Sequence, residues 1–72
     1  MDFWNFTGTP VSPGWHAALV CYDEQEGVFP RAAYWSAGAW TQRAVFAFGE
    51  RRDTKEDAER LAYEHDLDAL RV

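Results

Sequence analysis

The stretch that most constrains the fold is residues 28–48, VFPRAAYWSAGAWTQRAVFAF, in which a short polar break joins two apolar runs. The break is Ser36-Ala37-Gly38. The second run alternates as a strand does, and one of its faces holds Trp40, Gln42, Ala44, Phe46 and Phe48. The pattern predicts the central β-hairpin of a small sheet, with that face of its second strand toward the core.

A second hairpin is expected just before this one. Residues 15–22, WHAALVCY, are rich in strand-forming residues, and the polar turn of residues 23–26 ends at Gly27, which can adopt a positive φ. Neither face of this strand is plainly polar. Mixed faces are typical of a sheet covered on both sides, so we expect a helix on one face and the N-terminal arm on the other.

That arm is residues 1–14, which hold the aromatic residues Phe3, Trp4 and Phe6. The glycines and prolines that follow them break regular structure. Three aromatic rings so near a terminus either pack back over the sheet or stay outside as a contact surface for a partner.

Helix signals are strongest after residue 52. Asp53 or Thr54 can cap a helix that runs to about residue 65 or 66. One stripe at helical spacing is expected to face the sheet, and it consists of Ala58, Leu61, Ala62 and His65. Residues 67–72 either continue the helix or form a fourth strand.

The length of 72 residues predicts a single domain, residues 1–72, of α+β class. We expect an antiparallel sheet of three to four strands with one helix packed on it, in the order ββ-β-α with a final β as an alternative. A core of this size rarely gives more than about 3–5 kcal/mol of net stability. Four Trp, three Tyr and five Phe would compensate, and homodimerisation is the other common solution.

The net charge of −5 opposes direct binding to nucleic acid or anionic lipid, because both attract positive charge. The N-terminus lacks the basic residues of a signal peptide, and no apolar run approaches membrane-spanning length. The single cysteine, Cys21, suits a reducing compartment. The sequence therefore predicts a cytoplasmic protein that does not bind membranes.

No motif in the sequence names a reaction. Ser12 and Ser36 lie in turn sequences, and His16 and His65 match no familiar metal-ligand spacing. The five glycines are scattered and form no phosphate-binding loop. We expect no catalytic residue, no metal and no cofactor.

The acidity is concentrated near the C-terminus. Residues 53–68 hold seven carboxylates against Lys55 and Arg60, a local charge of −5. One alternative is a solvated helix face stabilised by weak ion pairs. The other is a partner-binding surface around Tyr63, an aromatic residue that the core does not need. The predicted partner-binding residues on the helix and in the first turn are Glu56, Glu59, Tyr63, Glu64, Asp23, Glu24 and Glu26.

A very short, acidic, cysteine-poor chain without catalytic residues resembles the accessory proteins that phages and mobile elements encode, anti-CRISPR inhibitors among them. The resemblance implies that the protein binds the basic, nucleic-acid-binding surface of a host protein or complex and blocks it. Two other functions stay open. One is an oligomerising accessory protein that associates through Phe3, Trp4 and Phe6. The other is a small enzyme subunit with a pocket assembled from His16, Tyr22 or Tyr34 and a carboxylate.

Overall fold

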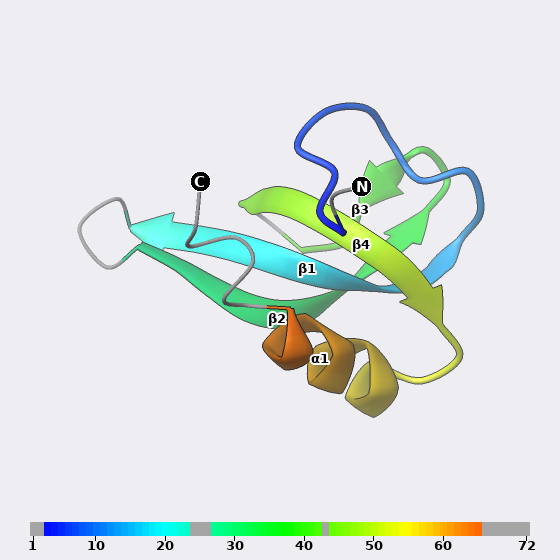
Figure 1. Ribbon diagram of the computed structural model, residues 1–72. Helices are drawn as coiled ribbons and strands as arrows, with labels where there is room; N and C mark the ends of the chain where they lie inside the picture. The colour runs from blue at the N-terminus through cyan, green and yellow to red at the C-terminus, as the bar shows by residue number, and fades with distance from the viewer. Residues whose placement is uncertain (1–2, 24–26, 43, 66–72) are drawn as a thin grey trace.

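The computed structural model describes residues 3–23, 27–42 and 44–65. Four strands precede one helix, and they are β1 (Gly14–Asp23), β2 (Gly27–Ser36), β3 (Ala39–Trp40), β4 (Val45–Arg52) and α1 (Lys55–Glu64). All strand pairs are antiparallel, and α1 packs on one side of the sheet (Figure 1). The predicted α+β class is confirmed. The choice between strand and helix for residues 67–72 concerns residues outside the described ranges.

The strand order is β3-β2-β1-β4, which places β1 between β2 and β4. β1 and β2 form the long hairpin, with Ala17 opposite Ala32. The predicted central hairpin of residues 28–48 is therefore wrong in its pairing. Only Ala39–Trp40 returns along β2, and the chain then crosses the sheet so that β4 pairs with the other side of β1.

Two alanines with positive φ accompany this change of course. Ala37 (φ 54°) and Gly38 (φ 80°) lie between β2 and β3, where a two-residue type I′ turn needs positive φ at both positions. Ala44 (φ 64°) precedes β4, and its carbonyl accepts a hydrogen bond from the Cys21 N–H at 3.0 Å. Alanine disfavours this conformation, so the sequence does not indicate the change of course at Ala44.

Bulges in β4 curl the sheet. Over their shared register β4 has more residues than β1, with one extra residue at Phe46 and another just before Arg51. A bulge bends a strand and increases its twist. As a result, the two outermost strands approach each other. The rings of Trp40 on β3 and Phe48 on β4 are 5.8 Å apart, centroid to centroid.

The bulge at Phe46 also changes which face of the second run is buried. Phe46 is 52% exposed, whereas Ala47, which the alternation places on the opposite face, is 2% exposed. The predicted core face is therefore wrong at these positions. An extra residue shifts every side chain beyond it to the other face, and the sequence pattern has no mark of where the shift occurs.

The sheet has a small core on each side. The buried cluster that includes helix residues consists of Trp4, Ala17, Leu19, Ala47, Leu61 and Ala62. The cluster on the opposite side consists of Ala18, Val20 and Ala33, with Trp40 and Val45 packed against it. Alanine is the most frequent residue in both clusters, so α1 and the segment that crosses from β3 to β4 can approach the sheet closely.

The helix forms where its sequence signals predict it. Thr54 is the N-cap, and its Oγ1 accepts a hydrogen bond from the Asp57 N–H at 3.2 Å. The buried face is Ala58, Leu61 and Ala62, as the spacing predicts. No helix among the described residues is long and apolar enough to cross a membrane.

The N-terminal arm divides between the two sides of the sheet: its first aromatic residues pack on the helix side, contrary to the prediction, whereas residues 7–12 lie beside His16 on the opposite side. Trp4 is 5% exposed and belongs to the core cluster with Leu61, and its Nε1–H donates to the carbonyl of His65 at 2.9 Å. The Phe3 ring stacks on the His65 ring with centroids 3.8 Å apart. Asn5 then exchanges two backbone hydrogen bonds with Phe48, so the arm extends along the free edge of β4.

Candidate functional site

The predicted partner-binding residues on α1 share its outer surface. Glu56 and Tyr63 are two turns apart on the side of the helix away from the sheet, and Glu59 and Glu64 flank them. Glu56, Tyr63 and Glu64 are exposed, and Glu59 is partly buried. We call these four residues the helix patch.

Of the predicted residues in the first turn, Asp23 alone falls within the described ranges. Asp23 is the last residue of β1, and its backbone lies opposite Gly27. Glu24 and Glu26 fall outside the described residues. The helix patch is therefore the part of the predicted surface that the structure describes.

Tyr63 is held in place by a residue that the sequence patterns do not single out. The Arg31 guanidinium of β2 donates to the Tyr63 hydroxyl at 3.2 Å and to the Pro30 carbonyl at 2.7 Å. The same guanidinium lies 5.7 Å from the centroid of the Phe29 ring. Arg31 thus bridges the outer edge of β2 and the helix, and it restrains a tyrosine side chain that is still 56% exposed.

The helix patch lies on a helix of negative net charge. Within α1, four carboxylates face Lys55 and Arg60, which gives a net charge of −2. The carboxylates of residues 66 and 68 are outside the described residues. Arg60 lies 4.0 Å from Asp57, an exposed pair that contributes little to stability. The patch is therefore an acidic surface with a positioned aromatic ring at one end.

A second candidate site lies between the arm and the sheet. A cavity of about 400 Å³, open to solvent, is lined by residues 7–12 together with Asn5, His16, Phe48, Gly49 and Arg51. Cavities that bind small ligands usually have volumes of about 300–1,000 Å³. Sequence patterns cannot reveal this cavity, because its wall is an irregular segment whose path depends on the pairing of Asn5 with Phe48.

His16 is the buried polar residue of this cavity, at 4% exposure. Its Nδ1 lies 3.0 Å from the carbonyl oxygen of Gly14, and its ring makes edge contacts with the rings of Trp40 and Phe48. Burial lowers the pKa of His16, the bond to Gly14 opposes that shift, and the positive charge of Arg51 adds to it. The imidazole is consequently neutral at pH 7.

Arg51 is fixed beside His16. Its Nε–H donates to the Pro13 carbonyl at 2.8 Å, and its Nη1 lies 3.6 Å from an oxygen of Asp53. The side chain passes directly over Gly14, where a Cβ would collide with the guanidinium group. Glycine at this position therefore allows the arginine to reach the cavity.

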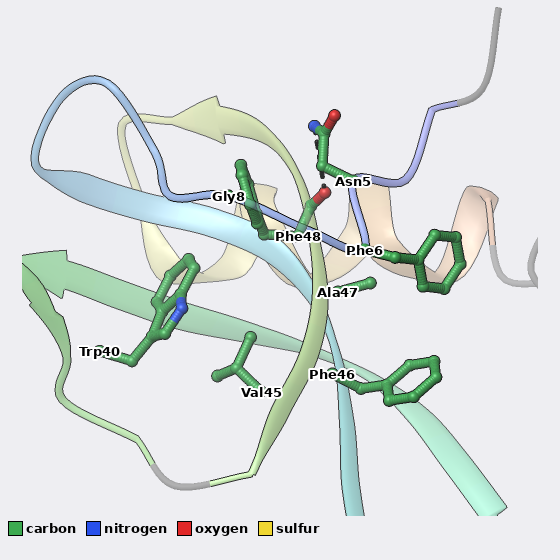
Figure 2. A pocket seen from close by; sticks show the side chains of 8 residues that line it. All are labelled: Asn5, Phe6, Gly8, Trp40, Val45, Phe46, Ala47 and Phe48. Carbon is green, nitrogen blue, oxygen red and sulfur yellow. Dashed lines mark hydrogen bonds between the residues drawn. The ribbon is translucent and has the colours of Figure 1, made fainter.

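Next to the main cavity is a smaller hollow of about 70 Å³, drawn in Figure 2. Phe6 and Phe46 project on one side of β4, and Trp40 and Val45 lie on the other. The rings of Phe6 and Phe46 meet edge to face with centroids 5.5 Å apart, and both are about half exposed. This pair is an exposed apolar surface at the edge of the sheet.

Among the described residues, no group of three or more His, Cys, Asp or Glu side chains gathers closely enough to hold a metal ion. Comparison with protein families, curated proteins and solved structures finds no match to the chain.

The buried imidazole predicts a specific dependence of stability on pH. In the unfolded chain His16 binds a proton near its ordinary pKa of 6.5, whereas in the folded protein it does so only at lower pH. Between these two values the unfolded state holds more protons, so the free energy of unfolding decreases as the pH falls below 6.5. Well above pH 6.5, His16 does not make the free energy of unfolding depend on pH.

Urea unfolding at pH 5.5 and pH 7.5 measures this effect. We expect the parent protein to lose more stability between the two pH values than the His16→Phe variant, which keeps an aromatic ring and cannot titrate. Equal losses in both proteins would show that the folded state accepts the proton on His16 as readily as the unfolded chain does.

Proposed function

We propose that the protein is a small protein-binding module whose helix patch contacts a basic surface of a partner protein. The observation that supports this proposal is the state of Tyr63, which is exposed by more than half and yet restrained by Arg31. A helix whose outer face is only solvated does not require a large exposed ring held in one position. Tyrosine is enriched at the centres of protein interfaces, where a large rigid ring gives contact area at a small entropic cost.

The carboxylates around Tyr63 define the chemistry of the partner. Glu56, Glu59 and Glu64 favour approach of lysine and arginine side chains, and the net charge of −5 strengthens this attraction at long range. The same charge repels phosphate groups. The partner surface is therefore a basic region of a protein, of the kind that proteins use to hold nucleic acid.

Occupation of such a region would exclude nucleic acid from it. The proposed activity is thus inhibition by occlusion, in line with the resemblance to small phage and mobile-element proteins, including anti-CRISPR inhibitors. Catalysis forms no part of this proposal.

Self-association is a second candidate, and the exposed pair Phe6–Phe46 favours it. Of the three arm aromatics, Phe3 and Trp4 pack within the protein, so Phe6 alone is left for this role. Together with Phe46 it forms an apolar contact at a sheet edge, where a second copy can dock. Size-exclusion chromatography of the purified protein distinguishes the two candidates, because self-association gives a dimer without any partner.

The test of the main proposal is capture followed by competition. Tagged protein is used to capture its partner from a lysate of the organism that carries it, and the partner is identified by mass spectrometry. The purified partner is then bound to labelled nucleic acid and titrated with the protein. We expect release of the nucleic acid at stoichiometric protein. A ternary complex that keeps its nucleic acid would contradict occlusion.

A further inference from the structure

His16 offers an unused hydrogen-bond acceptor to the cavity. A carbonyl oxygen only accepts, so the contact with Gly14 requires the hydrogen on Nδ1, which leaves a lone pair on Nε2 of the neutral ring. Nε2 has no hydrogen bond to any residue that the structure describes. In the described ranges, every fully enclosed side-chain nitrogen or oxygen has a hydrogen-bond partner. Nε2 has none, so it is not fully enclosed. His16 lines the cavity, which is therefore the place where a ligand could reach Nε2.

The other walls supply an aromatic surface and a donor. Phe48 lies beside His16 with ring centroids 6.2 Å apart, at an interplanar angle of 85°. Arg51 carries five N–H donors, and its Nε is already bound to the Pro13 carbonyl. This bond holds the guanidinium group at the cavity wall, one terminal nitrogen lies 3.6 Å from Asp53, and the side chain as a whole is about half exposed. The cavity therefore combines one acceptor, a positioned donor group and an aromatic ring.

We propose that this cavity binds a small aromatic molecule of the amide or lactam type, whose N–H donates to His16 Nε2 and whose carbonyl oxygen accepts from Arg51. An aromatic ring suits the wall formed by Phe48. A carboxylate fits less well, because it has no hydrogen to give to Nε2 and because the whole protein is acidic.

This site is separate from the helix patch. His16 alternates with Ala17 along β1, and Ala17 packs in the cluster that contains helix residues. Neighbouring side chains on a strand point to opposite faces, so His16 faces away from α1. A ligand in the cavity and a protein on the helix patch can be bound independently, and failure of one proposal leaves the other standing.

The probe for this site is benzamide, and its matched control is N,N-dimethylbenzamide, which keeps the ring and the carbonyl but has no N–H. Both are titrated into protein labelled with ¹⁵N at histidine, and the Nε2 resonance of His16 is followed at pH 7.5. For so small a probe we expect a Kd on the order of millimolar. Benzamide should shift the resonance, and the dimethyl compound should bind at least about tenfold more weakly.

Two variants complete the design. His16→Phe keeps a ring and removes the acceptor, so amide shifts in residues 7–12 should show about equal affinity for the two compounds. Tyr63→Phe changes the helix patch and should bind benzamide as the parent does. Equal affinity of the parent for both compounds, or no shift with either at 20 mM, a concentration about tenfold above the expected Kd, would overturn the proposal. The comparison on the parent protein decides the matter even if His16→Phe does not fold.

Discussion

Replacement of Trp4 by alanine is expected to lower the free energy of unfolding by about 3–5 kcal/mol, the usual cost of removing a buried tryptophan. Trp4 is 5% exposed, packs with Leu19 and Leu61, and donates a hydrogen bond to the His65 carbonyl. A domain of this size has a net stability of about the same magnitude. The variant should therefore be largely unfolded at 25 °C.

Phe6→Ala is the matched control, because Phe6 lies in the same arm but is 47% exposed. It loses mainly its edge contact with Phe46, worth about 0.5–1.5 kcal/mol. Both variants are compared with the parent by urea unfolding followed through far-UV circular dichroism. Equal, small effects would show that the arm does not contribute to the core, and that its aromatics are free for a partner.

The second large effect is expected in binding. Tyr63→Ala should weaken the complex with the basic partner by about 2 kcal/mol or more, which is roughly 30-fold, mostly through faster dissociation. The alanine variant removes the ring that Arg31 restrains on the helix surface. Stability should change little, because Tyr63 lies outside the buried face of Ala58, Leu61 and Ala62.

Tyr63→Phe separates the ring from its hydroxyl. It keeps the contact area and loses the hydrogen bond from Arg31, so its affinity should lie between those of the parent and the alanine variant. Both proteins are first checked for folding and are then compared by dissociation rate in surface plasmon resonance. An alanine variant that dissociates as slowly as the parent would remove Tyr63 from the interface.

The helix and the class of fold were accessible from sequence because their signals are local. Thr54 and Asp57 cap the helix through a hydrogen bond three residues apart, and Leu61 and Ala62 recur at helical spacing from Ala58. Each of these contacts depends on near neighbours in the chain. A reader of the sequence can therefore place them without knowing the tertiary structure.

The sheet topology was not accessible, because it depends on conformations that the residue types do not favour. Ala44 adopts a positive φ, and Phe46 is an extra residue in β4, although both continue a regular alternation in the sequence. Strand order is set by long-range pairing, such as Leu19 with Ala47. The residue types next to the bulge do not indicate that a bulge is present.

The candidate sites show the same difference between local signals, which the sequence reveals, and long-range contacts, which it does not. Local spacing brought Glu56 and Tyr63 together on one helix, but the restraint by Arg31 comes from β2, more than 30 residues earlier in the chain. Sequence patterns offer His16 only as a possible metal ligand or as part of an enzyme-subunit pocket. Its hydrogen bond to Gly14 spans two residues, but its burial depends on Trp40 and Phe48, which lie more than 20 residues later in the chain and contact it through the curled sheet.

The most direct test of the helix patch is the association rate of the partner as a function of ionic strength, for the parent and for the Glu56→Lys/Glu59→Lys variant. Exposed charges act mainly on encounter, so the variant should associate more slowly, and its rate should depend less on salt. Circular dichroism establishes that both proteins are folded. If the folded variant associates at the parent's rate at low salt, the acidic face of α1 is only solvated, and the partner binds elsewhere.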